Sequence, residues 1–223
     1  NGATLSATNA TSTSGPGMTN GVIGRGLSTT GLSGHVSEAI CYNRALTSVE
    51  KASIYSYLSV KYGITVAVTE HDYYDDATYS YDIFGIGKDT AQDLNQTTSS
   101  SENADGMVTI SSPSSLDSGD FLVVGNDNGA LSFSAYVGSN CAISTMLNRS
   151  WKAEETGECG TVTITFDLSS LTGINPDDIV LMVDQDGDGY NDENPIEGTY
   201  TAPNMVFTSV NLSDNATFSL AEG

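Results

Sequence analysis

The stretch NRSWKAEETGECGTVTITFDL, residues 148–168, decides the fold class of this 223-residue chain. In its first half, alternation places Arg149, Trp151 and Ala153 on one face of an expected strand, with charged residues between them. Its second half, GTVTITFDL, is a short run rich in β-branched residues. Trp151 is the only tryptophan and is expected to anchor the core of a β-sandwich. Arg149 shares its face and is expected to have a carboxylate partner, which the sequence does not identify.

Short runs of the same kind recur along the chain, separated by Gly, Asn, Asp, Ser or Pro. They include GVIGRG, HVSEAICY, DIFGIG, MVTISS, DFLVVGN, DIVLMVD, NMVFTSVNL and TFSLAE. Regularly spaced turns between short strands indicate an antiparallel sandwich or jelly roll. The sequence therefore predicts an all-β fold of tandem, jelly-roll-like antiparallel β-sandwich modules, with one short helix at their junction.

The helix is expected in LTSVEKASIYSYLSVKYG, at about residues 48–62. Thr47 and Glu50 have the spacing of a capping box, which satisfies two backbone donors at a helix start. Ile54, Leu58 and Tyr62 recur at helical spacing and are expected to form its buried stripe. The glycine that follows is expected to end the helix in a left-handed conformation.

Charge divides the chain into two unequal parts. Residues 1–66 carry four basic and two acidic groups, a net of +2, and residues 67–223 carry three basic and 26 acidic groups, a net of −23; together they give the formal charge of −21. A change this abrupt predicts a module boundary near residues 63–70. We therefore expect an N-terminal module over 1–66, which includes the helix, and an acidic β-sandwich module over 67–223.

The composition excludes several classes of partner. A chain with seven basic and 28 acidic residues does not suit nucleic acid or an anionic membrane, and cations are its natural counterpart. No apolar run approaches the length of a membrane span, so membrane insertion is not expected. The abundance of Thr, Ser, Gly, Asn and Asp is typical of a protein that works outside the cell. A chain that starts at Asn1 without a leader is expected to be a mature or excised piece.

The stretch VLMVDQDGDGYNDENP, residues 180–195, predicts a calcium loop. Asp184, Asp186 and Asp188 stand at positions 1, 3 and 5 of an EF-hand-like loop, and the glycine at position 6 permits the sharp bend. The loop follows a strand, so a whole EF-hand is excluded. The expected ligand residues are Asp184, Asp186, Asp188, Tyr190 through its carbonyl, Asp192 and Glu193.

The twelfth position of this loop breaks the pattern. Pro195 cannot supply the bidentate carboxylate, so Glu193 or Glu197 would have to take that role. The alternative is a solvated acidic turn without metal. Three aspartates in one turn repel one another unless a cation is present, which favours calcium.

The three cysteines are Cys41, Cys141 and Cys159. Cys141 and Cys159 are expected to form a disulfide in an oxidising compartment, worth roughly 3 kcal/mol in the loop-entropy model. Cys41 is expected to be a small buried apolar residue. Zinc is excluded, because no cysteine pair has the required spacing and the only histidines, His35 and His71, lie far apart.

Two further segments allow two interpretations. The group EHDYYDDATYSYD, residues 70–82, mixes tyrosines with carboxylates, which suits either sugar binding or half-buried strand packing, and packing is favoured. The segment GNDNG, residues 125–129, is either a ligand loop or a hairpin turn, and the turn is favoured.

Part of the chain resembles a known family. The run IGRGLSTTGLSGHVSEAICYNRALTSVEKASIYSYLSVKYGIT, residues 23–65, resembles the closing segment of a laminin-G or concanavalin-like jelly roll. The remainder resembles a β-sandwich module that follows such jelly rolls in secreted or cell-surface proteins of Bacteroidota. DTA, residues 89–91, is similar to the short O-glycosylation motif of that group, with Thr90 as the acceptor. A jelly roll has about eight strands, and the residues before YNRALT leave room for fewer. We therefore expect a fragment of a longer protein or strand pairing between copies.

No catalytic site is expected. Neither histidine has a nucleophile motif nearby, and no carboxylate pair can be selected among 28 acids. The leading expectation is a non-catalytic extracellular structural or adhesive surface protein, a fibre or filament subunit with a calcium-stabilised loop. Its partners would be copies of itself or neighbouring modules. The alternative is a carbohydrate-binding module for a polysaccharide, and a third possibility is a piece that positions an enzyme encoded elsewhere in a longer chain.

Overall fold

A computed structural model describes residues 35–40, 42–63, 74, 76–91, 93–103 and 105–223. They contain α1 (Ser48–Tyr62) and the short 3-10 helices η1 (Leu168–Ser170) and η2 (Pro176–Asp178). The strands of the larger sheet are β1 (Tyr81–Asp89), β2 (Leu94–Gln96), β5 (Phe121–Asn126), β6 (Phe133–Ala135), β7 (Thr145–Leu147), β8 (Trp151–Thr156), β10 (Ile179–Asp184), β11 (Ile196–Glu197) and β14 (Thr217–Glu222). The strands of the smaller sheet are β3 (Thr98–Ser100), β4 (Val108–Ser111), β9 (Thr161–Asp167), β12 (Thr199–Thr201) and β13 (Asn204–Asn211).

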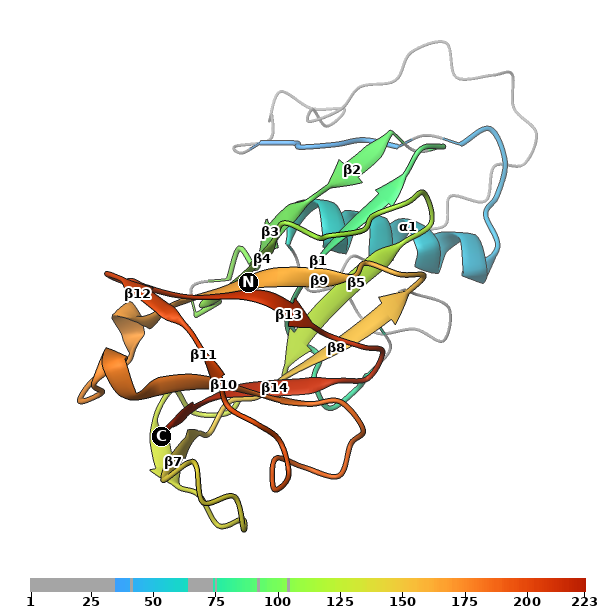
Figure 1. Cartoon of the computed structure of the whole chain (residues 1–223). Helices are drawn as coiled ribbons and strands as arrows, with labels where there is room; N and C mark the ends of the chain where they lie inside the picture. The colour runs from blue at the N-terminus through green and yellow to red at the C-terminus, as the bar shows by residue number, and fades with distance from the viewer. Residues whose placement is uncertain (1–34, 41, 64–73, 75, 92, 104) are drawn as a thin grey trace. The chain divides into compact units, whose positions relative to one another are not determined.

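The strands form two antiparallel sheets. The nine-stranded sheet has the order β11-β10-β14-β8-β5-β1-β2, with β7 also paired to β14 and β6 to β7, and the five-stranded sheet has the order β12-β13-β9-β4-β3. Figure 1 shows the two sheets facing each other. The predicted all-β sandwich fold with one short α-helix is therefore confirmed.

The main core lies between the two sheets. Trp151 on β8 is buried, stacks on Phe218 of β14 at 5.9 Å between ring centroids, and meets the edge of Phe166 on β9 at 5.3 Å. The predicted role of Trp151 as a core anchor is thereby confirmed. Strands β8 and β9, joined by the turn at 157–160, belong to opposite sheets, so this stretch supplies aromatic side chains to the core from both sides.

Arg149 lies beside this core and has the carboxylate partners expected for it. Its Nη2 lies 3.1 Å from Oδ2 of Asp105, and its Nη1 lies 3.6 Å from Oδ2 of the buried Asp82. The side-chain amides of Asn103 and Asn126 each donate to Asp82 at 2.7 Å. The network joins β1, the loop before β4, the GNDNG turn and the residues before β8, and every buried charge in it has a partner.

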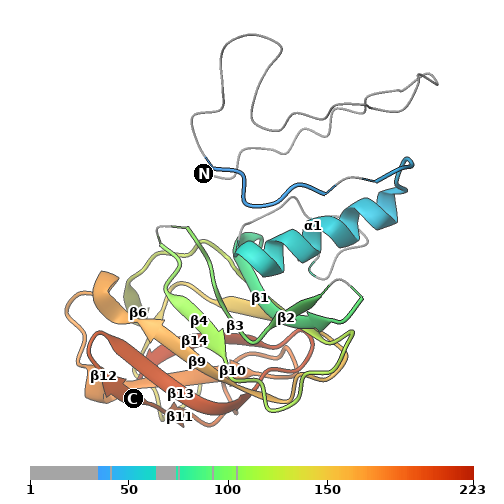
Figure 2. The same cartoon turned by 90° about the horizontal axis from the view of Figure 1, so that it is seen from above.

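A second apolar cluster lies on the outer face of the nine-stranded sheet, beneath α1. Val60 and Tyr57 of the helix pack with Leu94, Phe121 and Val123 of the sheet. The helix spans the range expected from the sequence, and the carbonyl of Val60 accepts a hydrogen bond from Nε2 of Gln96 on β2. Figures 1 and 2 show α1 beside the β1–β2 end of the sheet.

Gly63 ends the helix as expected. Its φ of +60° is in the left-handed region, and a Cβ there would lie 2.2 Å from the carbonyl oxygen of Ser100. Its own carbonyl accepts from the backbone N–H of Glu102 at 3.0 Å. Only glycine combines this backbone conformation with so close an approach.

The compact unit that contains the sandwich begins at the helix. Residues Ser48–Gly223 belong to one unit and Leu5–Thr47 to another. The sequence placed the helix in a module over 1–66, whereas the structure packs it on the sheet of the acidic sandwich. Within Leu5–Thr47, the described residues 35–40 and 42–47 form no helix or strand.

The expected disulfide between Cys141 and Cys159 is not formed, and that prediction is corrected. Both are free thiols: Cys141 is exposed, whereas Cys159 is fully buried in the core between the sheets. The alternation of β9 places the turn before it close to the core, so the Cys159 side chain packs as an apolar residue. Cys41 lies outside the described residues.

None of the helices in the described part of the chain is long and apolar enough to cross a membrane.

Candidate metal site

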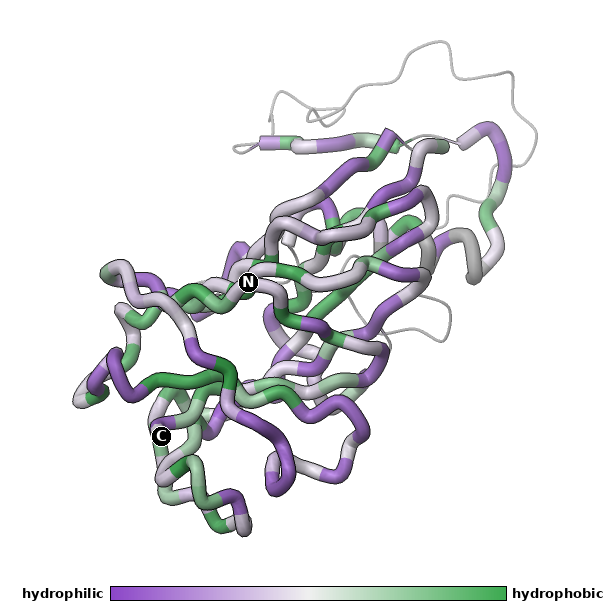
Figure 3. Tube along the Cα trace, viewed as in Figure 1, coloured by the Kyte–Doolittle hydropathy of each residue, from purple (hydrophilic) through white to green (hydrophobic). Residues whose placement is uncertain are grey.

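The predicted calcium loop begins at the end of β10. All six residues of this strand are buried, and its last residue, Asp184, pairs with Thr217 of the neighbouring β14. The chain then leaves the sheet in the loop 185–195, which is strongly hydrophilic (Figure 3). A carboxylate is therefore fixed at the end of a rigid strand in the interior of the sheet.

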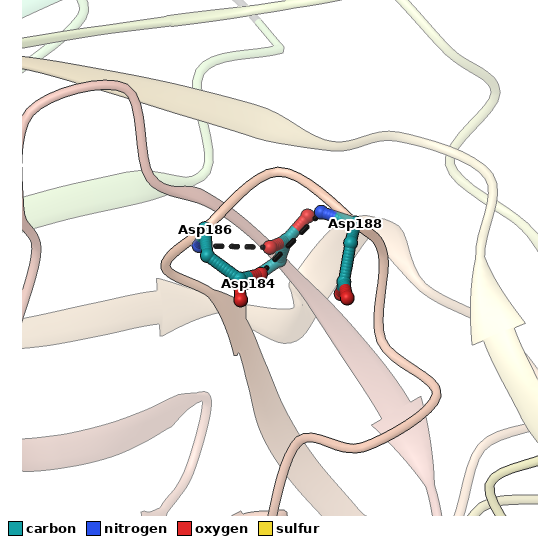
Figure 4. A group of neighbouring side chains, drawn as sticks. All are labelled: Asp184, Asp186 and Asp188. Carbon is teal, nitrogen blue, oxygen red and sulfur yellow. Dashed lines mark hydrogen bonds between the residues drawn. The ribbon is translucent and has the colours of Figure 1, made fainter.

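Three carboxylates gather in this loop. Oxygens of Asp184, Asp186 and Asp188 all lie within 4.8 Å of one another. The side chain of Asp184 is buried, whereas those of Asp186 and Asp188 are exposed (Figure 4). The structure thus brings together the three aspartates of the DxDxDG spacing.

The carboxylate of Asp184 also organises the loop. Its Oδ1 accepts from the backbone N–H groups of Asp186 at 3.2 Å and Gly187 at 2.7 Å, and its Oδ2 accepts from Gly189 at 3.0 Å. Gly187 and Gly189 have φ values of +81° and +100°, which disfavour any residue with a Cβ. The glycines let the backbone turn its N–H groups toward Asp184.

Nearby negative charge acts on the carboxylate of Asp188. The negative charge of Asp186, then that of Asp192, raises the pKa of Asp188 above its ordinary range. A cation between these carboxylates would favour their ionised forms and lower the same pKa.

The other three expected ligand residues lie differently. Asp192 contributes charge next to Asp188, but it is not among the three carboxylates that converge. The carbonyls of Tyr190 and Glu193 both accept from Nδ2 of Asn140, each at 2.8 Å. Oε1 of Glu193 lies 3.4 Å from the backbone N–H of Gln185. The converging part of the site therefore contains three of the six residues.

Sequence reasoning missed two residues that hold this loop in place. Asn140, in the loop between β6 and β7, donates to the two carbonyls of the Asp184 loop described above. In the other direction, Oδ1 of Asn191 accepts from the hydroxyl of Tyr136 at 3.0 Å and from the N–H of Ser139 at 2.7 Å. The two loops are about fifty residues apart in sequence, and nothing in their composition indicated the pairing.

The donor set defines the chemistry open to this loop. Aspartate carboxylates are hard oxygen ligands, which suit Ca²⁺ or Mg²⁺ rather than the metals that require thiolate or imidazole. The exposure of Asp186 and Asp188 leaves room for water to complete the coordination of a cation.

The other predicted sites have local partners. Thr90 is exposed, and its hydroxyl lies 3.0 Å from that of Ser118. In the GNDNG segment, Asn126 belongs to the Arg149 network and Asn128 has a φ of +57°, as a turn requires.

Of the tyrosine and carboxylate group at 70–82, residues 70–73 and 75 lie outside the described part. Tyr74 is buried and donates to the carbonyl of Tyr79 at 2.9 Å. Asp76 accepts from Nζ of Lys152 at 2.7 Å. Tyr74 and Asp76 therefore hold this segment against the outer face of the nine-stranded sheet.

Comparison with known proteins gives a family and no relative of known activity. No curated protein and no solved structure matches the chain. A family model described as Domain of unknown function (DUF8202) matches residues 50–216, from the first turn of α1 to the residue before β14. Because the match covers well over half of the 223 residues, the chain belongs to the DUF8202 family of domains of unknown function.

Proposed function

We propose that this chain is a non-catalytic structural or adhesive module of an extracellular surface protein, in which calcium bound at the Asp184 loop stabilises the sandwich. The observation that carries the proposal is the convergence of three carboxylates within 4.8 Å at the end of a buried strand. An anionic chain placed outside the cell would meet millimolar calcium, the range in which extracellular modules bind it.

The position of the site favours a stabilising role over a catalytic one. Asp184 is held by β10, which pairs with β14 along its whole length. The loop is in turn fixed to the 136–142 loop through Asn140 and Asn191. A cation at Asp184 would therefore join the end of the nine-stranded sheet to two surface loops.

Thermal unfolding tests this function. In 10 mM calcium the protein is expected to melt about 3 °C higher than in chelator, because binding selective for the folded state at about ten times Kd contributes about 1.4 kcal/mol. Magnesium at the same concentration is expected to shift Tm less, because Mg²⁺ gives up its water reluctantly.

A matched pair of variants separates the loop from general charge. Asp186→Asn with Asp188→Asn should abolish the calcium shift, whereas Asp177→Asn with Glu158→Gln, which removes the same charge from exposed positions elsewhere, should preserve it. Equal shifts in the two double variants, or no shift in the parent protein at 10 mM calcium, would refute the calcium role.

A further inference from the structure

The outer face of the five-stranded sheet carries an unusual set of side chains. In β9 the core residues Val162, Ile164 and Phe166 alternate with outward threonines, and the other strands follow the same alternation. The outward residues of β3, β4, β9 and β12 are mostly hydroxylic, whereas those of β13 include Asn204 and Val206. The hydroxylic residues are Thr98, Ser100, Thr109, Ser111, Thr161, Thr163, Thr165, Thr199 and Thr201. Strands β4, β9 and β13 lie side by side in Figure 2.

The strand register sets these residues in rows. One row crosses all five strands, and a second crosses three of them. The first consists of Thr199, Val206, Thr165, Thr109 and Ser100, and the second of Thr163, Ser111 and Thr98. Neighbouring side chains in a row are therefore separated by the strand spacing of about 4.8 Å.

The hydroxyls at the centre of this face have no partner within the described protein. Thr109, Thr163 and Thr165 are half-exposed, and none of their side chains hydrogen-bonds to another described residue. Thr161, at the start of β9, does have one, with its hydroxyl 3.3 Å from that of Ser114. The central hydroxyls are thus free to bind something outside the chain.

The face is also electrically neutral in a protein of net charge −21. Among its described residues the only ionisable group is Asp167, at the end of β9, and its carboxylate is turned to the backbone N–H of Ser169 at 2.9 Å. A face without charge offers no contact by which to select an anionic or cationic partner. Its occupant must be uncharged and rich in hydrogen-bonding oxygens.

The spacing of the rows matches one such partner. Two oxygens hydrogen-bonded to the same tetrahedral water at about 2.75 Å lie about 4.5 Å apart. Hydroxyls at the strand spacing of about 4.8 Å can therefore hold a row of waters at nearly the separation found in ice.

We propose that this threonine face, defined by the two rows above, binds the surface of ice crystals. The face spans roughly 19 Å across five strands and 23 Å along β9, or roughly 450 Å². This is well below the roughly 800 Å² per partner of a stable protein interface, so a second copy of the chain fits poorly. The described residues of the face include no aromatic side chain for stacking on sugars, which argues against a polysaccharide. The proposal does not depend on the calcium loop.

The test is the growth of single ice crystals in a solution of the intact chain at about 0.1 mM. At this concentration most of the binding sites are occupied if Kd is about 10 μM. The parent protein is expected to shape the crystals into facets and to separate the freezing point from the melting point. Thr163→Lys with Thr165→Lys should abolish both effects, because each ammonium group holds its own hydration shell in the middle of the face. Thr156→Lys with Thr172→Lys adds the same charge at exposed threonines outside the face and should retain them.

The fold of each variant is checked by its melting temperature. If the lysine pair fails to fold, Thr163→Val with Thr165→Val keeps the β-branched packing of β9 and is expected to remove the faceting as well. Round crystals with the parent protein would overturn the proposal, as would equal activity in the face and control variants. Pelleting with crystalline cellulose or chitin, or dimerisation abolished by the lysine pair, in the absence of ice shaping would assign the face to a polysaccharide or to a second copy instead.

Discussion

At the scale of single residues, the sequence predicted what depends on local spacing. Asp184, Asp186 and Asp188 converge because alternate residues of one tight turn point the same way, and that geometry needs no distant contact. The partners of Asn140 and the carboxylates around Arg149 could not be predicted, since they join segments that only the sheet order brings together. The predicted disulfide was wrong for the same reason. Closeness in sequence placed Cys141 near Cys159, and the fold put one at the surface and the other in the core.

The two described thiols should differ in reactivity. Burial, followed by the nearby charge of Glu155, raises the pKa of Cys159 to about 12, so its thiolate is scarce at neutral pH. Cys141 is exposed. Brief treatment with iodoacetamide at pH 8, followed by peptide mass spectrometry, is expected to modify Cys141 and to leave Cys159 intact until the protein is unfolded in urea. Comparable labelling of both cysteines in the folded protein would contradict the placement of Cys159 in the core.

At the scale of elements, the bounds of the helix could be predicted from the spacing of Thr47 and Glu50 and from the terminal glycine. Its buried face could not. The sequence favoured a stripe through Ile54, Leu58 and Tyr62, which are half-buried. The residue that is fully buried against the sheet is Val60, with Tyr57 packed beside it. Both stripes are apolar at helical spacing, and the choice between them depends on the surface that the helix meets. Periodicity specifies that a helix is amphipathic more firmly than it specifies which neighbour it covers.

Truncation of Val60 tests this packing. Val60→Ala removes two methyl groups from a fully buried site and is expected to destabilise the protein by about 2 kcal/mol, which lowers Tm by about 5 °C. Val137→Ala makes the same chemical change at a side chain that is 95% exposed and should leave Tm unchanged. If the two variants melted at the same temperature, α1 would not be held by the contact described here.

At the scale of the whole molecule, the β-sandwich could be predicted because many short alternating strands have few other ways to bury their apolar faces. The assignment of strands to sheets could not. The run TVTITFDL follows SWKAEET after the four-residue turn 157–160, yet β8 and β9 lie in opposite sheets and do not pair. The sequence carries no local mark of that crossing, since the side chains of both strands alternate in the same way.

The balance of charge makes stability depend on pH in two opposing ways. Burial acts to raise the pKa of Asp76, but the hydrogen bond from Lys152 and those from the backbone outweigh it, so the pKa is lowered. This group stabilises the fold above the ordinary aspartate pKa, and the contribution is lost as the pH falls through the lowered value. Burial and the charges of Glu158, Asp214 and Asp120 raise the pKa of Glu155, so its ionised form destabilises the fold and protonation relieves that effect as the pH falls.

Urea unfolding in chelator should therefore give a higher midpoint at pH 5 than at either pH 7 or pH 3. General repulsion among 28 acidic residues adds to the same trend between pH 7 and pH 5. Glu155→Gln, which keeps an acceptor for the N–H of Cys159, is expected to reduce the gain between pH 7 and pH 5. A midpoint that declines steadily from pH 7 to pH 3 in the parent protein would show that the repulsion does not control stability.

The place of β14 in the nine-stranded sheet has a mechanical consequence. This final strand lies inside the sheet, with β10 along one side and β8 and β7 along the other. Tension applied at its C-terminal end is shared between two hydrogen-bonded ladders, whereas an edge strand would peel away one bond at a time. The Asp184 loop sits at the far end of the longer ladder, where Asp184 pairs with Thr217. A cation bound there would anchor the end of that ladder that lies farthest from the applied tension.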